Sequence, residues 1–534
     1  MVGTENDESR GSGLDRRWLL GASAAVVGAA AVAATLVGGD GEGKPAAGSA
    51  EPAQHSGSAS GAASAHPTAT EQDLPGDPGW RLASAGPQNA IEGYTDKVSV
   101  LSGESVGLRV STTSGSFRVS AYRMGWYGGA EARLVWRSGR VPGGAQSAAR
   151  FDAATRTVYT EWHDSLTLST KGWPEGAYLL RLEADSGHQR YTPLIVRSPS
   201  ASGAGKIVIM HAPATWQAYN LWGGYSLYQG ENGAYDTRSY AASFDRPYDA
   251  VGAEKFLVYE RALVSLAERM RLPVAYTTGI DVHNDPSILA GARAVISLGH
   301  DEYWTPQQRR HVTQARDAGV NVAFLGANTC FRRIRFDPSP TGADRKVVCY
   351  KTSYERDPVY GRESAQVTTD YRAAPAADPE SSMTGVLYEG YPTDAPFVVH
   401  SADHWLYEGT GVKNGDSFAH LVGVEYDRVT PDQPTPRPIQ VIAHSPLKCN
   451  GKSSHSDAAY YTVPSGAGVF ASGTMRWVEG LMAGTRDDGG DHGMNARTAT
   501  FVTRVTENLL TAFAAGPAAH VRPTPRDNVH EVYS

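Results

Sequence analysis

A short turn, Gly299–Trp304, carries a histidine, two carboxylic acids and a phenol in consecutive positions. The apolar run Ala292–Leu298 precedes it and indicates a buried strand. Thr305 and Pro306 follow it as the predicted N-cap and first residue of a helix. In open α/β sheets, ligands bind just outside the carboxyl ends of the strands. Titratable side chains concentrated at such a turn therefore favour chemistry over packing.

The available side chains favour oxygen ligation of a hard metal ion. The chain has no HExxH motif and no pair of histidines at the spacing of a usual zinc site. No serine or cysteine stands in this turn, where glutamine-amidotransferase-like folds carry a nucleophile, although Cys330 leaves a cysteine hydrolase open as a weaker alternative. Phenolate and carboxylate oxygens suit ferric iron better than zinc. A bound metal would lower the phenol pKa below its free value of about 10.

The elements that must position this turn follow from the hydrophobic pattern. Apolar runs predict four buried strands, and helical spacing predicts two intervening helices. The strands are Lys206–Met210, Pro273–Tyr276, Ala292–Leu298 and Val320–Leu325, and the helices are Glu254–Met270 and Pro306–Ala318. This repetition predicts a parallel, doubly wound sheet. A further amphipathic helix is predicted over Ala496–Ala514.

Because parallel strands end on the same edge of a sheet, we expect the polar residues that follow them to converge. They are His211, Trp216, Tyr219 and Tyr228 after the first strand, His300, Asp301, Glu302 and Tyr303 after the third, and Asn328 and Thr329 after the fourth. Within this set, we expect Asp301 to cap the following helix. We expect Tyr303 and Trp304 to pack rather than react.

The N-terminal part has a different pattern. From about Pro75 to Arg197, short alternating strands between glycine-rich turns predict a β-sandwich. The Gly-x-Ser-x-Gly motif Gly103–Gly107 joins two such strands, which predicts a hairpin turn, because a nucleophile elbow requires a strand followed by a helix. The predicted fold is α/β and β: an N-terminal β-sandwich followed by a doubly wound, glutamine-amidotransferase-like (flavodoxin-like) α/β domain with a mixed C-terminal extension. The predicted parts are a signal (1–38), a flexible linker (39–72), the β-sandwich (73–198), the α/β domain (205–515) and a tail (516–534).

The N-terminus resembles a bacterial twin-arginine export signal, because Arg16 and Arg17 precede a weakly apolar Gly/Ala/Val run. It predicts export by the twin-arginine route to the extracellular space or cell envelope, with membrane contact only through this segment. An uncleaved membrane anchor is the alternative. The net charge of −7 gives no electrostatic footprint for nucleic acid. The three cysteines allow at most one internal disulfide, and we expect them to be structural.

Several longer sequence motifs resemble those of the N,N-dimethylformamidase large (beta) subunit-like family, whose characterised enzyme is an amide hydrolase. The resemblance covers both globular parts, from about Ile91 to Ala515. The motifs are Ile91–Tyr94, Tyr122–Gly129, Thr215–Asn220, Ser243–Tyr248, Gly299–Trp304 and Gly326–Thr329.

The resemblance implies a mononuclear iron held by two tyrosines and a glutamate, with a catalytic histidine beside them. Carried over by motif, the metal ligands are Tyr219, Tyr228 and Glu302, with Tyr248 as a rival to Tyr228. The catalytic residues are His300, Asn328, Glu425 and Lys351, with Tyr461 as a further match in place of a phenylalanine.

The function expected from this resemblance is metal-assisted hydrolysis of a small-molecule amide by a secreted, N,N-dimethylformamidase-like protein. The chain lacks the glycine-rich acidic segment expected after the second tyrosine, so the substrate stays open. The alternative is a catalytically inactive, secreted or cell-surface binding protein. Its ligand would be a glycan or a protein. The sandwich tryptophans Trp126, Trp136, Trp162 and Trp173 could then bind glycan or pack within the domain, and we expect most of them to pack in the core. The residues also leave open a homo-oligomer and the need for a small partner subunit.

Overall fold

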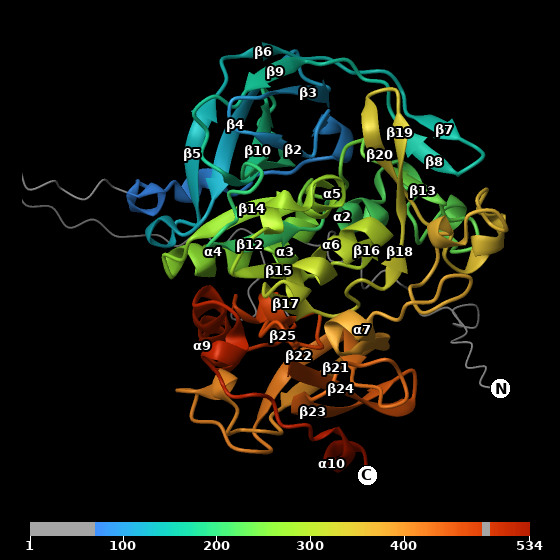
Figure 1. Ribbon diagram of the computed structural model, residues 1–534. Helices are drawn as coiled ribbons and strands as arrows, with labels where there is room; N and C mark the ends of the chain where they lie inside the picture. Colours follow the sequence, from blue (N-terminus) through green and yellow to red (C-terminus); the bar gives the residue numbers. More distant parts are fainter. Residues whose placement is uncertain (1–69, 483–491) are drawn as a thin grey trace, which may run out of the picture. The chain divides into compact units, whose positions relative to one another are not determined.

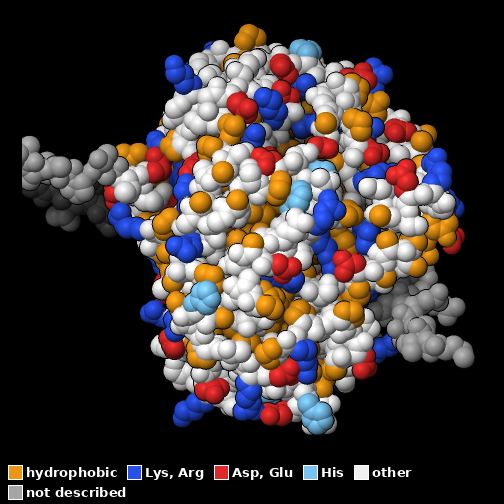
Figure 2. All heavy atoms as spheres, in the orientation of Figure 1, with side chains coloured by type: hydrophobic (Ala, Val, Ile, Leu, Met, Phe, Trp, Pro, Cys, Tyr) orange, Lys and Arg blue, Asp and Glu red, His pale blue; other side chains and the backbone are white. Residues whose placement is uncertain are grey.

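The computed structural model describes residues 70–482 and 492–534, and residues 71–534 form one compact unit (Figure 1). The predicted signal and nearly all of the predicted linker lie outside the described residues. Strands outweigh helices in the described chain. Among the helices described, none is both long and apolar enough to cross a membrane. On the face shown in Figure 2, basic and acidic side chains are interspersed over the surface.

Two sheets enclose the N-terminal core. One has the strand order β1-β3-β9, and the other has the order β2-β11-β10-β4-β5, with β6 paired to β4. Their bounds are β1 Ile91–Thr95, β3 Ser105–Thr112, β9 Leu166–Ser169, β2 Ser99–Leu101, β11 Gln189–Arg197, β10 Gly176–Ala184, β4 Ser116–Met124, β5 Ala132–Arg137 and β6 Val141–Pro142. Alternate side chains of both sheets share one apolar core, which includes Leu108, Val119 and Leu180.

The Gly103–Gly107 segment is not a hairpin turn, so that prediction is wrong. It leads from β2 to β3, but β2 pairs with β11 and β3 pairs with β1 and β9. The turn therefore carries the chain from one sheet to the other. Ser105 begins a strand rather than a helix, so a nucleophile elbow is excluded.

A seven-stranded sheet forms the centre of the second part, in the order β14-β12-β15-β17-β25-β24-β23. The four predicted strands are present and parallel, and β25 adds a fifth parallel strand. Strand β24 pairs antiparallel with β25, and β23 pairs antiparallel with β24. The bounds are β14 Val274–Thr278, β12 Ile207–His211, β15 Ala294–Gly299, β17 Asn321–Gly326, β25 Gly468–Ala471, β24 Lys452–Thr462 and β23 Ile439–Cys449.

Alternate residues of this sheet pack into different apolar clusters on its two faces. Ile207 and Ile209 of β12 join a cluster with helices α3 (Glu254–Tyr259), α4 (Arg261–Arg269) and α9 (Ala496–Ala514). Val208 and Met210 join a different cluster, which includes Val312 of helix α6 (Pro306–Asp317). Burial on both faces explains why the parallel strands are apolar along their whole length. Assignment to the glutamine-amidotransferase-like or flavodoxin-like group stays a prediction.

Local sequence signals placed two helices correctly. Helix α6 spans Pro306–Asp317, and the Thr305 side chain accepts from the Gln308 backbone N–H as its cap. Helix α9 spans Ala496–Ala514, as predicted. Asp301 does not cap α6; its buried carboxylate instead accepts a hydrogen bond from the Ser297 hydroxyl at 2.9 Å.

The predicted helix Glu254–Met270 is broken at Glu260 into α3, Glu254–Tyr259, and α4, Arg261–Arg269. Glu260 accepts from the Trp216 indole N–H at 2.8 Å, and its carboxylate lies 2.5 Å from His211 Nδ1. His211 is the last residue of β12, and Trp216 follows that strand, so a long-range contact explains why the local helical pattern fails here.

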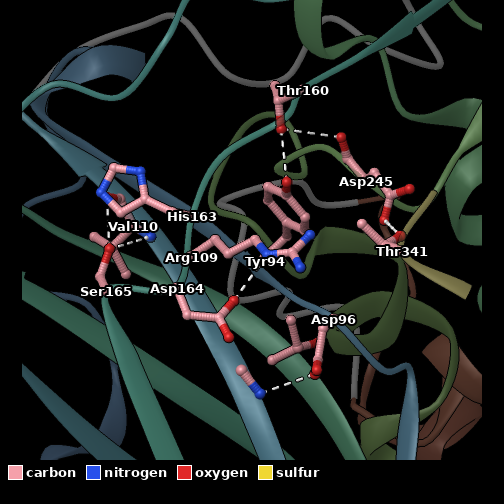
Figure 3. Close-up of polar contacts among 12 residues, drawn as sticks. Tyr94, Asp96, Arg109, Val110, Thr160, His163, Asp164, Ser165, Asp245 and Thr341 are labelled. Atoms are coloured by element: carbon pink, nitrogen blue, oxygen red, sulfur yellow. Dashed lines mark hydrogen bonds and ion pairs between the residues drawn. The ribbon is translucent and has the colours of Figure 1, made fainter.

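Buried polar contacts join the sandwich to the central sheet. In Figure 3, the Thr160 hydroxyl donates to Tyr94 and to the Asp245 carbonyl. Elsewhere the Arg123 guanidinium donates to the Glu268 carboxylate of α4 at 2.6 and 3.1 Å. Both members of this ion pair are buried. The sandwich therefore packs on the α/β part through specific contacts.

The remaining elements surround the carboxyl edge and the C-terminal extension. They are β7 Arg150–Asp152, β8 Thr157–Tyr159, α2 Pro213–Tyr219, β13 Ala241–Ser243, α5 Gly279–Asn284, β16 Tyr303–Trp304, β18 Arg332–Arg333, β19 Arg335–Ser339, β20 Gly342–Val348, α7 Ser381–Thr384, β21 Leu387–Val398, β22 Ser417–Arg428, α8 Trp477–Gly480 and α10 Val529–Tyr533.

Candidate active site

Helix α2 connects the first strand of the sheet to the Gly299–Trp304 turn. The helix begins two residues after β12 and ends at Tyr219. Its Thr215 hydroxyl accepts from the backbone N–H groups of Glu302 and Tyr303 at 3.1 and 3.3 Å. One threonine therefore fixes the turn beyond β15 against the helix that carries Tyr219.

Tyr228 lies in the loop that follows α2, and a buried arginine holds this loop. The Arg246 guanidinium donates to the carbonyls of Asn220, Trp222 and Tyr225 at 2.8–3.1 Å. Burial lowers the pKa of Arg246 to about 10. Because its donors are aimed at successive carbonyls between the two tyrosines, Arg246 sets the path of the chain from Tyr219 to Tyr228.

Three oxygens form a close triangle at the carboxyl edge of the sheet. The Tyr219 hydroxyl donates to Glu302 Oε2 at 2.7 Å, and its oxygen lies 2.8 Å from the Tyr228 hydroxyl oxygen. The Tyr228 hydroxyl lies 2.7 Å from both oxygens of Glu302. Tyr303 donates to the Tyr228 hydroxyl at 2.8 Å from outside the triangle.

This triangle fits an octahedral hard metal ion. With metal–oxygen distances of about 2.0 Å, neighbouring oxygens of an octahedron lie about 2.8 Å apart. The three donors are oxygens, two of them phenolic, which is the set that ferric iron prefers over zinc. In addition, the buried atoms His300 Nδ1 and Asn328 Oδ1 have no hydrogen-bond partner among the described residues. Buried polar atoms of that kind are costly unless a ligand or substrate satisfies them.

His300 lies between two carboxylates. Its Nε2 is 3.5 Å from Glu302 Oε2 and 3.5 Å from Glu425 Oε2. Asn328 donates from Nδ2 to Glu425 at 2.8 Å, and its backbone N–H donates to Asp427 at 2.8 Å. Strand β22 of the C-terminal extension therefore supplies one wall of the site.

Close backbone packing brings the strand ends together behind His300. Gly299 has a φ of 41°, and a Cβ there would meet Tyr259 at 2.6 Å. A Cβ on Gly326, at the end of β17, would lie 1.9 Å from the Gly299 carbonyl oxygen. Glycine at both strand ends permits this approach, which places Asn328 near His300.

The charges around Glu302 stabilise its carboxylate. Arg332 donates from Nε to Glu302 Oε1 at 3.1 Å, and the Lys351 ammonium lies 3.1 Å from the centre of the Tyr228 ring. Burial opposes ionisation, but His300, Arg332 and Lys351 together hold the pKa of Glu302 well below its usual range. Burial also raises the pKa of Glu425, against the charge of His300. The site thus pairs a firmly ionised carboxylate with one that retains a proton more readily.

The pKa values of the phenols are shifted in the direction opposite to that of Glu302. Burial, reinforced by the Glu302 charge, raises the pKa of Tyr219, Tyr228 and Tyr303 well above 10. Without a metal all three phenols are therefore protonated, and Tyr219 and Tyr228 donate to Glu302. A metal ion would take the place of these protons, because it stabilises the phenolate form.

The structure brings together seven residues predicted from the sequence: Tyr219, Tyr228, Glu302, His300, Asn328, Glu425 and Lys351. Two others lie elsewhere. The Tyr248 hydroxyl contacts Gln217. The Tyr461 hydroxyl accepts from Arg316 and donates to the Met383 carbonyl.

Sequence reasoning missed Arg332 as the ion-pair partner of Glu302. The signal was weak, because Arg332 belongs to β18, which pairs with β16 next to Glu302 but is distant in sequence. Tyr303 does pack, as expected, and it also donates to Tyr228.

All three cysteines are free and buried. Burial raises the pKa of the Cys330 thiol well above its usual range, so this thiol is not poised as a thiolate nucleophile. Trp162 and Trp173 of the sandwich are also buried, which removes them from any ligand-binding surface.

A family model described as N,N-dimethylformamidase beta subunit-like, C-terminal, matches residues 118–491. The chain belongs to this family. It is therefore a dimethylformamidase-like protein, and the membership supports a hydrolase- or amidase-like description. The resemblance based on the sequence motifs is confirmed, and the matched range includes all seven residues that the structure brings together at the site.

Other comparisons add little to the dimethylformamidase-like assignment. No curated protein matches the chain. A crystal structure of cycloisomaltooligosaccharide glucanotransferase from Paenibacillus sp., complexed with cycloisomaltoheptaose, is similar at 12% identity and a TM-score of 0.14. The alignment covers 48% of this chain and 33% of that chain, so this protein spans about a third of its length. So low a TM-score supports no argument about fold or function.

Proposed function

We propose that this dimethylformamidase-like protein is an amide hydrolase that uses a mononuclear iron held by Tyr219, Tyr228 and Glu302. The observation that carries the proposal is the triangle of their oxygens, with sides of 2.7–2.8 Å, next to His300. His300 Nε2 lies 3.5 Å from Glu302, and its buried Nδ1 has no hydrogen-bond partner among the described residues. Iron bound there would supply Lewis acidity to a water molecule and an amide carbonyl.

The surrounding residues have separate roles in this proposal. His300, whose Nε2 lies 3.5 Å from both Glu302 and Glu425, moves a proton between the attacking water and the leaving amine. Asn328 uses one amide hydrogen for Glu425 and keeps the second for the developing oxyanion. Such a contact is worth about 2.7–4 kcal/mol in comparable sites. Lys351 and Arg332 keep Glu302 ionised, so that it is ready to bind the cation.

Glu302→Gln tests the proposal directly. The wild-type protein is expected to hold stoichiometric iron, show a tyrosinate-to-iron charge-transfer band and hydrolyse small amides. Glu302→Gln should lose all three, because a neutral amide is a poor ligand for a hard cation. Glu408→Gln, on an exposed glutamate, is the matched control and should retain all three. Full iron and full rate in Glu302→Gln would refute the assignment.

We also propose that the chain is exported by the twin-arginine route. The support is the Arg16-Arg17 pair before an apolar run, in the part of the chain outside the described residues. A homo-oligomer, or a small partner subunit, would be revealed by the mass of the purified, active protein in solution.

A further inference from the structure

A second group of metal-ligating side chains lies at the far edge of the central sheet. His444 of β23 pairs directly with Asp457 of β24, and His455 lies two residues before Asp457 on the same strand face. The potential ligand atoms of these three residues all lie within 4.8 Å of one another. The imidazole rings of His444 and His455 have centroids 4.4 Å apart.

Asp457 is firmly positioned. Its carboxylate is fully buried, accepts from the Val429 backbone N–H at 2.9 Å, and also accepts from the Tyr533 hydroxyl. Its other oxygen lies 2.7 Å from His444 Nδ1. This contact holds the His444 imidazole beside the Asp457 carboxylate.

His455 supplies the second, independent observation. Its Nε2 is buried and has no hydrogen-bond partner among the described residues. Two imidazoles and one carboxylate on adjacent strands are a recurrent ligand set for borderline divalent metals.

We propose that His444, His455 and Asp457 form a second metal site, which takes zinc or a similar borderline divalent ion. Three protein ligands leave a coordination position for water, and the Tyr533 ring, 5.1 Å from that of His455, covers one side. The bound ion would tie β23 and β24 together next to the C-terminal helix α10. The site shares no residue with the Tyr219–Tyr228–Glu302 centre, so either proposal can fail without the other.

The test is metal uptake by the full-length protein and by His455→Ala, measured by equilibrium dialysis against Zn²⁺ and elemental analysis. His455→Ala should weaken binding at this site by more than about 100-fold, because it removes a ligand. The substitution breaks no hydrogen bond of Nε2, so the fold should be retained, and circular dichroism checks this. Iron content at the tyrosine centre should be unchanged in His455→Ala.

Two controls separate the sites. His163→Ala, on an exposed histidine of the sandwich, should take up zinc like the wild type. Glu302→Gln should retain the zinc that His455→Ala loses. Added Zn²⁺ should raise the Tm of wild type and Glu302→Gln but not that of His455→Ala. Equal zinc uptake and an equal Tm response in wild type and His455→Ala would overturn the proposal.

Discussion

The Tyr219 and Tyr228 rings stack with centroids 4.3 Å apart, and their hydroxyls lie 2.8 Å from each other. Both hydroxyls donate to the same carboxylate, that of Glu302. Burial raises the pKa of both phenols, so the pair would be costly to ionise without a cation. In the proposed function, the bound iron supplies that cation.

Removing one phenol hydroxyl at a time should distinguish a metal ligand, Tyr228, from a residue that only supports that ligand, Tyr303. Tyr228→Phe is expected to lower iron affinity by more than about 100-fold, because a ligand oxygen is lost. Tyr303→Phe removes only a hydroxyl that donates to Tyr228, and we expect a loss of about 10-fold. Iron titration, followed through the charge-transfer band, gives both values. Equal affinities for the two variants would argue against Tyr228 as the second phenolic ligand.

Arg246 should control the site through the loop rather than through contact with the metal. Arg246→Lys leaves several buried carbonyls without a donor, and we expect it to lower the free energy of unfolding by about 2–5 kcal/mol and reduce iron occupancy. Urea denaturation measures the first effect and elemental analysis the second. Arg150→Lys, on the sandwich surface, should change stability by less than about 1 kcal/mol. Unchanged stability in Arg246→Lys would show that the loop is held by other contacts.

The buried His404 predicts a pH dependence of stability. Burial, aided by the charge of Arg522, lowers the pKa of His404 from 6.5 to about 3. The unfolded chain therefore binds a proton below pH 6.5 that the folded chain does not, so stability falls as the pH falls from about 6.5 towards 3. At pH 5 this residue alone should cost about 2 kcal/mol relative to pH 7.5.

His404→Asn keeps an acceptor for the Leu406 backbone N–H and removes the titrating group. The difference in the free energy of unfolding between pH 7.5 and pH 5 should therefore shrink by about 2 kcal/mol. Urea denaturation at the two pH values measures it, with His163→Asn as the exposed control. An unchanged difference in His404→Asn would contradict the lowered pKa.

Export can be tested on the N-terminal pair alone. Replacing Arg16 and Arg17 by lysine should retain the protein in the cytoplasm of a host that has the twin-arginine pathway, whereas the wild type should reach the envelope or the medium. Cell fractionation and immunodetection provide the measurement. Equal export of both forms would mean that another route, or none, acts on this segment.

Predictions from local sequence signals are correct where short-range forces decide the structure. Thr305 caps α6, because its hydroxyl reaches an N–H three residues away. The same local reasoning failed at Asp301 and Glu260. Asp301 accepts a hydrogen bond from Ser297 and Glu260 accepts one from Trp216, and neither contact follows from a capping signal or from helical spacing. It also missed the His444–His455 pair, because pairing of β23 with β24 brings the two residues together.

The hydrophobic period is a local property, so the amino-acid sequence is enough to predict that polar residues follow several parallel strands and converge on one edge of the sheet. Which of these residues are in contact depends on the packing of the folded chain. Tyr219 and Glu302 are 83 residues apart in sequence, and Asn328 and Glu425 are 97 apart. Such contacts depend on how Thr215, Arg246 and the glycines at the strand ends pack. This packing cannot be predicted from the hydrophobic pattern of the sequence. The choice of Tyr228 rather than Tyr248 as the phenol beside Tyr219 was made in the same way, by the path that Arg246 imposes on the intervening loop.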